Sequence, residues 1–423
     1  MAATGVNPHR TPVTMRSGRK QAEYALQASP NNPVKGVKGL PVIELLPSFD
    51  PVRGIATDYM HSVCLGVTKK MVSLWFDTKN HDQEYYIGRK ADVVNKRLEA
   101  IRPPTEIHRA PRSLSERHYW KASEWWAFLL YSLVVLQQVL PVRFLNHYFL
   151  YVYGIYTLLG DSIDQESISS AKVALTKFVI QVEHLYGLRH CSYNIHSLTH
   201  LAHCVKNCGP LWATSAFIFE SHNHCLLKMF NGTQYVPQQI TDTFLLKRKL
   251  ASFERLCSDD DCSASVVTLL EKLNGHTKFA LGNTTGLGRA THLELTASQA
   301  LAIQNLLMVN VVNRCGISYE RFVYSHRNYS SVNYTRAKRH SNYSVLYQTD
   351  EKCIGTVLNL MCIKPSCQCS ANIMQYCNCK QYSVVLLRPT IVSTQFLFKD
   401  SDFGIASNFL HEVVDRDHVV ATS

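Results

Sequence analysis

The segment Thr57-Asp58-Tyr59-Met60-His61-Ser62-Val63-Cys64-Leu65-Gly66-Val67 decides how the first half of this chain is interpreted. Residues 54–57 just before Asp58 are predicted to form a short extended segment, as are residues 40–46. Apolar residues at helical spacing predict a helix over 59–76. Asp58 is therefore expected at a strand-to-helix junction. There its carboxylate can bind a divalent metal ion while His61 steadies the backbone or a phosphate. The structural alternative is that the Asp58 carboxylate only caps the helix.

A second acidic residue, Glu220, follows the apolar stretch Gly209-Pro210-Leu211-Trp212-Ala213-Thr214-Ser215-Ala216-Phe217-Ile218-Phe219. An isolated buried carboxylate would take up a proton, so Glu220 must be solvated, paired or bound to a metal ion. Pairing with a helix neighbour such as His224 is the structural alternative.

Several phrases, in this order, resemble those of a known family. Asp58-Tyr59-Met60-His61 is similar to the D-x-x-H signature around the second catalytic acid of CACTA-type (En/Spm-like) DDE DNA transposases, and Phe219-Glu220 resembles the region of their third acid. Further phrases resemble animal members of the family: Gly36-Val37-Lys38-Gly39-Leu40, Trp120-Lys121-Ala122-Ser123-Glu124, Asn194-Ile195-His196 with His200-Leu201, and Gly209-Pro210-Leu211-Trp212. The resemblance covers about residues 35–240, and more weakly the rest.

This resemblance implies an RNase H-like core with a long helical insertion between the second and third acids. It also implies that Asp58 and Glu220 are two of three carboxylates that hold two Mg²⁺ ions, with His61 assisting. In such enzymes a metal-bound water attacks a phosphodiester, and the released 3′-hydroxyl joins new DNA.

The sequence departs from the family at the first acid. Only Glu23 and Asp50 precede Asp58, and Asp50 stands before Pro51 as a turn residue. We therefore expect an N-terminally truncated or host-domesticated, transposase-derived protein that binds DNA but is catalytically impaired. The alternatives are an active Mg²⁺-dependent transposase or nuclease completed by upstream sequence, and a protein interaction scaffold that does not bind DNA.

The expected fold class is α/β and predominantly helical. It comprises a flexible basic arm (1–38), a partial RNase H-like transposase domain (39–310) with a helical insertion of about 80–208, and a small β-rich C-terminal domain (316–423). Helices are predicted over 90–101, 113–140, 142–159, 169–186, 195–207, 212–230, 237–256 and 298–309, the last capped by Ser298. Alternating runs predict strands over 343–347, 355–363 and 382–387.

The charge balance favours a polyanionic partner. The chain has 44 Lys and Arg against 32 Asp and Glu, a formal charge of +12, which favours nucleic acid first and an acidic membrane surface second. Two basic clusters are candidates for DNA contacts: Arg102, Arg109, Arg112, Arg117 and Lys121, and, interleaved with tyrosines, Arg336, Lys338 and Arg339. A solvated charged loop is the alternative for each.

Two further groups are metal candidates. Cys367, Cys369, Cys377 and Cys379 form a C-x-C-x₇-C-x-C pattern that can bind zinc, although its pairs are tighter than usual; reduced thiols on a β-hairpin are the alternative. His196, His200 and His203 share one face of a predicted helix, with Cys204 and Cys208 nearby. That spacing permits metal ligation as well as ordinary packing.

The sequence also bears on localisation. Fourteen scattered Cys suit a reduced cytoplasmic or nuclear protein, and the N-terminal residues lack the apolar run of a secretory signal. Two apolar stretches, 125–140 and 144–159, are interrupted by polar residues, so we expect a buried helical hairpin turning at Pro141 and no membrane span. A homo-oligomer is compatible with the sequence.

Overall fold

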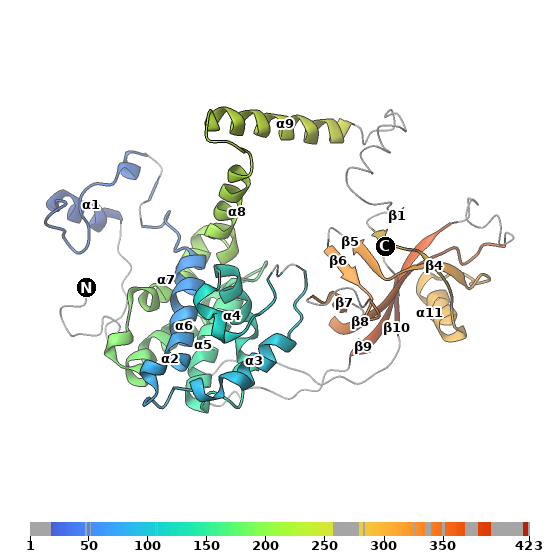
Figure 1. The fold of residues 1–423 in the computed structure, drawn as a ribbon, viewed down its shortest axis with the longest axis horizontal. Coiled ribbons are helices and arrows are strands. Elements are labelled where there is room, and N and C mark those ends of the chain that lie inside the picture. The colour runs from blue at the N-terminus through green and yellow to red at the C-terminus, as the bar shows by residue number, and fades with distance from the viewer. Residues whose placement is uncertain are drawn as a thin grey trace. The chain divides into compact units, whose positions relative to one another are not determined.

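The computed structural model describes residues 18–46, 49–50, 52–105, 107, 109–256, 279–281, 284–324, 327–334, 340–348, 352–368, 380–390 and 418–421. The chain divides into two compact units. The first contains Met1–Ile101 and Pro111–Lys228, and the second contains Arg102–Ala110 and Met229–Ser423 (Figure 1).

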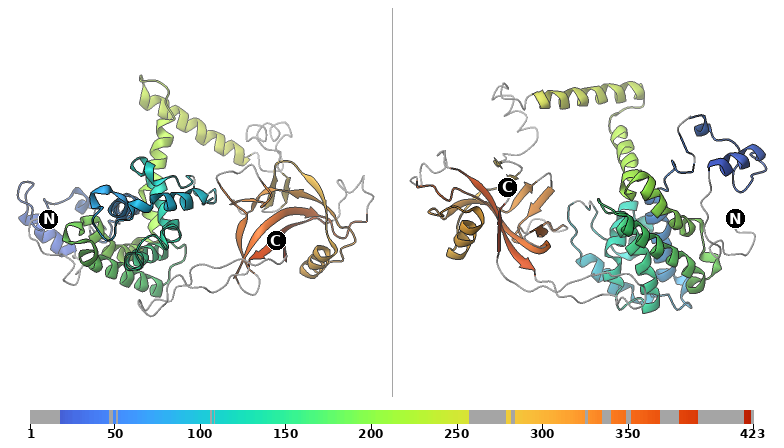
Figure 2. Two further views of the ribbon diagram at one scale, coloured as in Figure 1. Left: turned by 60° about the horizontal axis from the view of Figure 1, so that its bottom comes forward. Right: turned by 180° about the vertical axis from the view of Figure 1, so that it is seen from behind.

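The first unit is built from helices (Figures 1 and 2). In chain order they are α1 (Gly18–Gln27), η1 (Val42–Leu45), η2 (Met60–Thr68), α2 (Lys69–Phe76), η3 (Thr78–Asn80), η4 (Gly88–Lys90), α3 (Ala91–Ala100), η5 (Leu114–Tyr119), α4 (Ala122–Leu136), α5 (Val142–Leu158), α6 (Gln165–Tyr186), η6 (Leu188–His190), α7 (Tyr193–Cys208), η7 (Leu211–Thr214) and α8 (Ala216–Leu227). The segment η2 is a π-helix that continues directly into α2, and the other η segments are 3₁₀-helices.

The aromatic helix α5 holds η2 in place. It packs against α4 and α6, and its Tyr148 ring lies edge-on to Trp75 of α2, with 4.8 Å between the ring centroids. The buried hydroxyl of Tyr151 donates to the carbonyl oxygen of Val63 at 3.2 Å and lies 2.8 Å from the Thr68 hydroxyl. These contacts fix both the middle of the π-helix, at Val63, and its end, at Thr68. None of the described helices combines the length and apolar character needed to cross a bilayer.

The strands expected over 40–46 and 54–57 are not formed. Val42–Leu45 is a 3₁₀-helix, and 54–57 has no partner strand. Extended segments need hydrogen-bonded neighbours to be stable, and residues 18–256 as described contain only two isolated bridges, Ser29 with Asn32 and Val34 with Val37. The sheet of an RNase H-like core is therefore not seen in this part of the chain.

The helix expected over 113–140 is two helices. Lys121 is extended, and the Glu124 carboxylate accepts the backbone N–H of Lys121 at 2.8 Å, which begins α4 afresh after η5. The hairpin of α4 and α5 that the sequence predicts does form, with α5 beginning directly after Pro141.

The second unit contains α9 (Val236–Leu256), α11 (Ala297–Leu307) and two antiparallel sheets. The smaller sheet has the strand order β1 (Phe279–Leu281), β2 (Thr284–Leu287), β5 (Arg321–Tyr324) and β6 (Arg327–Ser330). The larger has the order β10 (His418–Ala421), β9 (Tyr382–Thr390), β8 (Lys352–Ile363), β4 (Cys315–Tyr319) and β3 (Thr291–Glu294), with β7 (Ser344–Gln348) also paired to β8.

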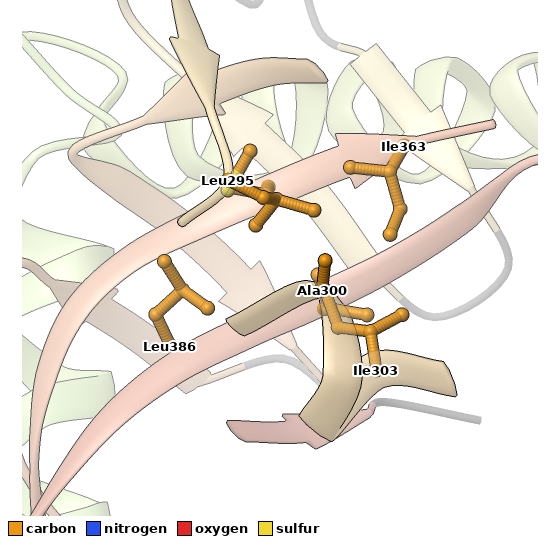
Figure 3. Close-up of a cluster of buried hydrophobic side chains, with 7 residues drawn as sticks. Leu295, Ala300, Ile303, Ile363 and Leu386 are labelled. Carbon is orange, nitrogen blue, oxygen red and sulfur yellow. The ribbon is translucent and has the colours of Figure 1, made fainter. Parts of the chain in front are cut away.

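Helix α11 covers one face of the larger sheet. Ala300 and Ile303 pack into a buried cluster with Ile363, Leu386 and Leu295 (Figure 3). The sequence assigned this helix to the domain before residue 310, but the structure places it with the sheet because its apolar face is buried there. The division between the units thus differs from the boundary expected near Gly316. The cap is also different, since the Thr296 hydroxyl, not Ser298, accepts the N–H of Gln299.

The segment Arg102–Ala110 belongs to the second unit. Its Thr105 N–H donates to the Asn342 side chain at 2.9 Å, and the Asn342 amide donates back to the Thr105 hydroxyl at 2.8 Å. Ser341 N–H donates to the Pro103 carbonyl at 2.9 Å. The proline-broken loop is therefore anchored by hydrogen bonds within this unit.

Candidate functional site

Asp58 lies where two helices begin. One carboxylate oxygen, Oδ1, accepts the backbone N–H of Met60 at 3.3 Å and that of Ala216 at 2.8 Å. The other, Oδ2, accepts the backbone N–H of His61 at 2.9 Å and lies 2.5 Å from Nδ1 of the His61 ring. The carboxylate therefore caps η2 and α8 together, at the positive ends of both helix dipoles.

These hydrogen bonds set the ionisation of Asp58. Partial burial works against the charged form, but the bonds from Ala216 and His61 outweigh it, and the pKa of Asp58 lies below its usual value. Asp58 is thus a carboxylate at neutral pH. Because a carboxylate only accepts, the His61 Nδ1 donates to it.

Glu220 lies on the other side of the same imidazole. His61 Nε2 is 3.8 Å from Glu220 Oε1, too long for a direct hydrogen bond. The Glu220 side chain is 61% exposed, so this acid is solvated and contacts His61. Packing of the Tyr59 and Phe217 rings, with centroids 6.2 Å apart, holds η2 and α8 together here. The three residues singled out from sequence are therefore one cluster, Asp58, His61 and Glu220.

The cluster can orient and polarise one imidazole, as an acid–base pair does. A magnesium ion would instead need lone pairs on the carboxylates. Each oxygen of Asp58 already accepts two hydrogen bonds, and among the described residues no group of three His, Cys, Asp or Glu is placed to hold an ion. In this conformation the cluster does not fit the two-magnesium site expected from the family.

Two of the arginines predicted to contact DNA instead form ion pairs within the first unit. Arg112 Nε lies 2.5 Å from Oε1 of Glu124, whose side chain is 2% exposed, and its Nη1 lies 2.5 Å from Glu116. Arg117 donates to Asp77 at 2.9 Å and to the Leu114 carbonyl. Both guanidinium groups are therefore engaged within the first unit.

The remaining predicted DNA contacts are distributed differently. Lys121 is exposed in the first unit, whereas Arg102 and Arg109 are exposed in the second. Arg336, Lys338 and Arg339 lie outside the described residues. The residues of the first cluster are therefore divided between the two units.

A basic cluster that the sequence did not predict includes Lys70 of α2. It consists of Lys70, Lys79 and Arg189 around His190. Burial and these three cations lower the pKa of His190 to about 4, and burial with Lys79 and Arg189 lowers the pKa of Lys70. Asp77 contacts Lys79 at 3.6 Å, so it offsets only part of the positive charge. Lys70 and Lys79 are far in sequence from Arg189 and His190, so no local pattern indicates the cluster.

The two metal candidates have different outcomes. Cys367 is buried, and its N–H donates to the Lys364 carbonyl, but Cys369, Cys377 and Cys379 lie outside the described residues, so the zinc prediction for them stays a prediction. The histidines all lie on α7 as expected. Nε2 of His196 and Nε2 of His200 are 3.3 Å apart, whereas His203 Nε2 lies 3.1 Å from the Asn207 amide.

Comparison with family models, with known proteins and with solved structures gives no match for this chain. The assignment of function therefore rests on the residues and geometry described above.

Proposed function

We propose that this chain is a DNA-binding protein derived from a CACTA-type DDE transposase and catalytically impaired as it stands. One observation carries the proposal: Asp58 and Glu220, predicted from separate motifs far apart in sequence, both contact the ring of His61. A shared ancestral catalytic site would explain why residues from two separate motifs lie together in the fold.

DNA binding is supported by charge. The chain carries a formal charge of +12, and the cluster of Lys70, Lys79 and Arg189 concentrates positive charge on the first unit. Burial lowers the pKa of Lys70 most, and repulsion from Lys79 and Arg189 lowers it further. Phosphate groups would relieve that repulsion, so the DNA backbone is the partner that this cluster fits best.

Impaired catalysis is supported by the state of Asp58. Its oxygens are occupied by helix N–H groups and by the His61 ring, and the cluster holds two carboxylates instead of three. In this proposal the helices from about 80 to 208 correspond to the family's helical insertion. No counterpart of the RNase H-like sheet occurs among residues 18–256 as described, so the relation to that fold rests on the motifs.

Duplex binding and strand cleavage, measured on the full chain, test the proposal. Fluorescence anisotropy across a salt series should show affinity that falls steeply as salt rises, because bound phosphates release counterions. Cleavage and strand transfer in Mg²⁺ or Mn²⁺ should be absent and should stay absent in Asp58→Ala. Salt-independent or undetectable DNA binding would favour the scaffold alternative. Cleavage that Asp58→Ala abolishes would favour the active enzyme.

A further inference from the structure

The histidine pair of α7 has a geometry that the proposed function does not use. His196 and His200 are one helical turn apart and point to the same side, with ring centroids 5.1 Å apart and ring planes at 74°. Their Nε2 atoms approach to 3.3 Å. Both side chains are half-buried, so they are less able to move apart than surface histidines are.

That separation is the one that a shared metal ion demands. Zinc–nitrogen bonds are about 2.0–2.1 Å long, so two nitrogens on neighbouring corners of a tetrahedral zinc ion are about 3.3 Å apart. Histidines at positions i and i+4 of a helix are a recurrent way to supply two such ligands. The pair therefore already has the ligand spacing of a bound ion.

The ligand type also suits a metal. Imidazole nitrogens are preferred ligands of zinc, nickel and copper ions. A hydrogen bond between two neutral rings is the competing explanation for the contact.

The pair lies on a part of α7 that packs along η2. Cys204 Sγ lies 3.8 Å from the Thr57 hydroxyl at one end of this contact, and the Asn194 side chain lies against Gly66 at the other. His196 and His200 fall between these two points on α7. An ion bound there would stiffen the helix that supports the π-helix carrying His61.

We propose that His196 and His200 form a two-histidine site for a zinc-class divalent ion, with water completing the coordination. His203 is not a ligand, since its ring faces Asn207. The site is independent of the proposed DNA function, and binding of zinc does not require DNA.

Zinc-dependent stabilisation of the first unit tests the site. All five tryptophans lie in that unit, so thermal unfolding followed by tryptophan fluorescence reports on it alone, without a contribution from the C-terminal cysteines. Added ZnCl₂ should raise the Tm of the wild-type chain, because an ion that binds only the folded form stabilises it. His196→Gln and His200→Gln should each weaken zinc binding roughly tenfold or more. His203→Gln, on the same helix, should keep the wild-type response.

A second measurement covers the case in which a glutamine variant fails to fold. In ¹⁵N-labelled wild-type protein, zinc should shift the ring Nε2 signals of His196 and His200 and leave those of His203 in place. Zinc-induced shifts at His203 alone, an unchanged zinc response in His200→Gln, or no response in the wild type would overturn the proposal and leave a hydrogen-bonded pair only.

Discussion

The carboxylate of Asp58 accepts a hydrogen bond from the backbone N–H of Ala216, 2.8 Å away and 158 residues further along the chain. The same carboxylate holds the His61 ring. One side chain therefore joins two helix beginnings and orients the imidazole that faces Glu220. Asp58 therefore has a structural role in addition to its contact with His61.

Removing this carboxylate should destabilise the first unit. Asp58→Ala leaves the N–H groups of Met60, His61 and Ala216 without their acceptor, and we expect a loss of about 2 kcal/mol in the free energy of unfolding. Asp58→Asn keeps one oxygen and should lose about half as much. Urea unfolding followed by tryptophan fluorescence measures both.

Glu220→Gln is the matched control. This side chain is largely exposed, so its replacement should change stability by less than about 0.5 kcal/mol. Equal stability of Asp58→Ala and the wild type would mean that the carboxylate does not join the two helices.

The helices of the bundle could be predicted from sequence because their burial repeats with the helical period. For α6, buried residues such as Ala171, Leu175, Phe178 and Val182 follow that spacing, and Asp164 caps the helix through Ser167 N–H. The segment 40–46 could not be predicted in this way. A short apolar run is compatible with a strand or a helical turn, and only a neighbouring strand decides between them.

The site could be predicted only in part. The motifs named Asp58, His61 and Glu220, but the occupation of both Asp58 oxygens depends on α8 beginning beside them. Likewise, the pairing of Arg112 with Glu124 cannot be predicted, because Glu124 lies twelve residues away on α4 and is not recognisable as buried from sequence. Long-range contacts of this kind have no local signature.

Arg112 should prove essential for stability and not for DNA binding. Arg112→Ala removes the guanidinium from the buried carboxylate of Glu124, and a buried acceptor that loses such a partner costs about 1–3 kcal/mol. Lys121→Ala, an exposed neighbour, should cost less than about 0.5 kcal/mol. Differential scanning fluorimetry at fixed pH compares them. A Tm for Arg112→Ala equal to that of Lys121→Ala would contradict the structural role.

The cluster beside α2 should carry part of the DNA affinity. Lys70→Gln and Arg189→Gln each remove one cation, so each should weaken duplex binding for all sequences and reduce the slope of log K against log salt by about 1. Lys172→Gln, an exposed lysine on α6, makes the same change in net charge elsewhere. Anisotropy titrations at several salt concentrations distinguish the two cases. Equal effects of all three variants would indicate a dependence on net charge alone.

Acid should weaken the first unit through His147. This ring is 2% exposed, donates from Nε2 to the Phe178 carbonyl at 2.9 Å, and burial lowers its pKa to about 4 from 6.5. Between pH 4 and 6.5 His147 is protonated in the unfolded chain but not in the folded one. The free energy of unfolding is therefore highest above pH 6.5 and falls as the pH drops towards 4. The loss can reach about 3 kcal/mol. Urea unfolding between pH 4 and 7 should show a shallower pH dependence in His147→Phe, and an unchanged slope would assign the acid sensitivity to other groups.

Gly66 should be required for the close packing of the π-helix on α7. A Cβ at this position would lie 2.6 Å from the Asn194 amide nitrogen and 2.9 Å from the carbonyl oxygen of His61. The amide can rotate, but the carbonyl belongs to the backbone of the residue that faces both acids, so Gly66→Ala must displace it. We expect a loss of about 1–3 kcal/mol by urea unfolding, and a shift of the His61 ring resonances in the NMR spectrum. Gly160→Ala provides the comparison, because its Cβ would approach nothing closer than 3.4 Å. If both alanine variants unfold at the same urea concentration, η2 and α7 are not packed as closely as these distances require.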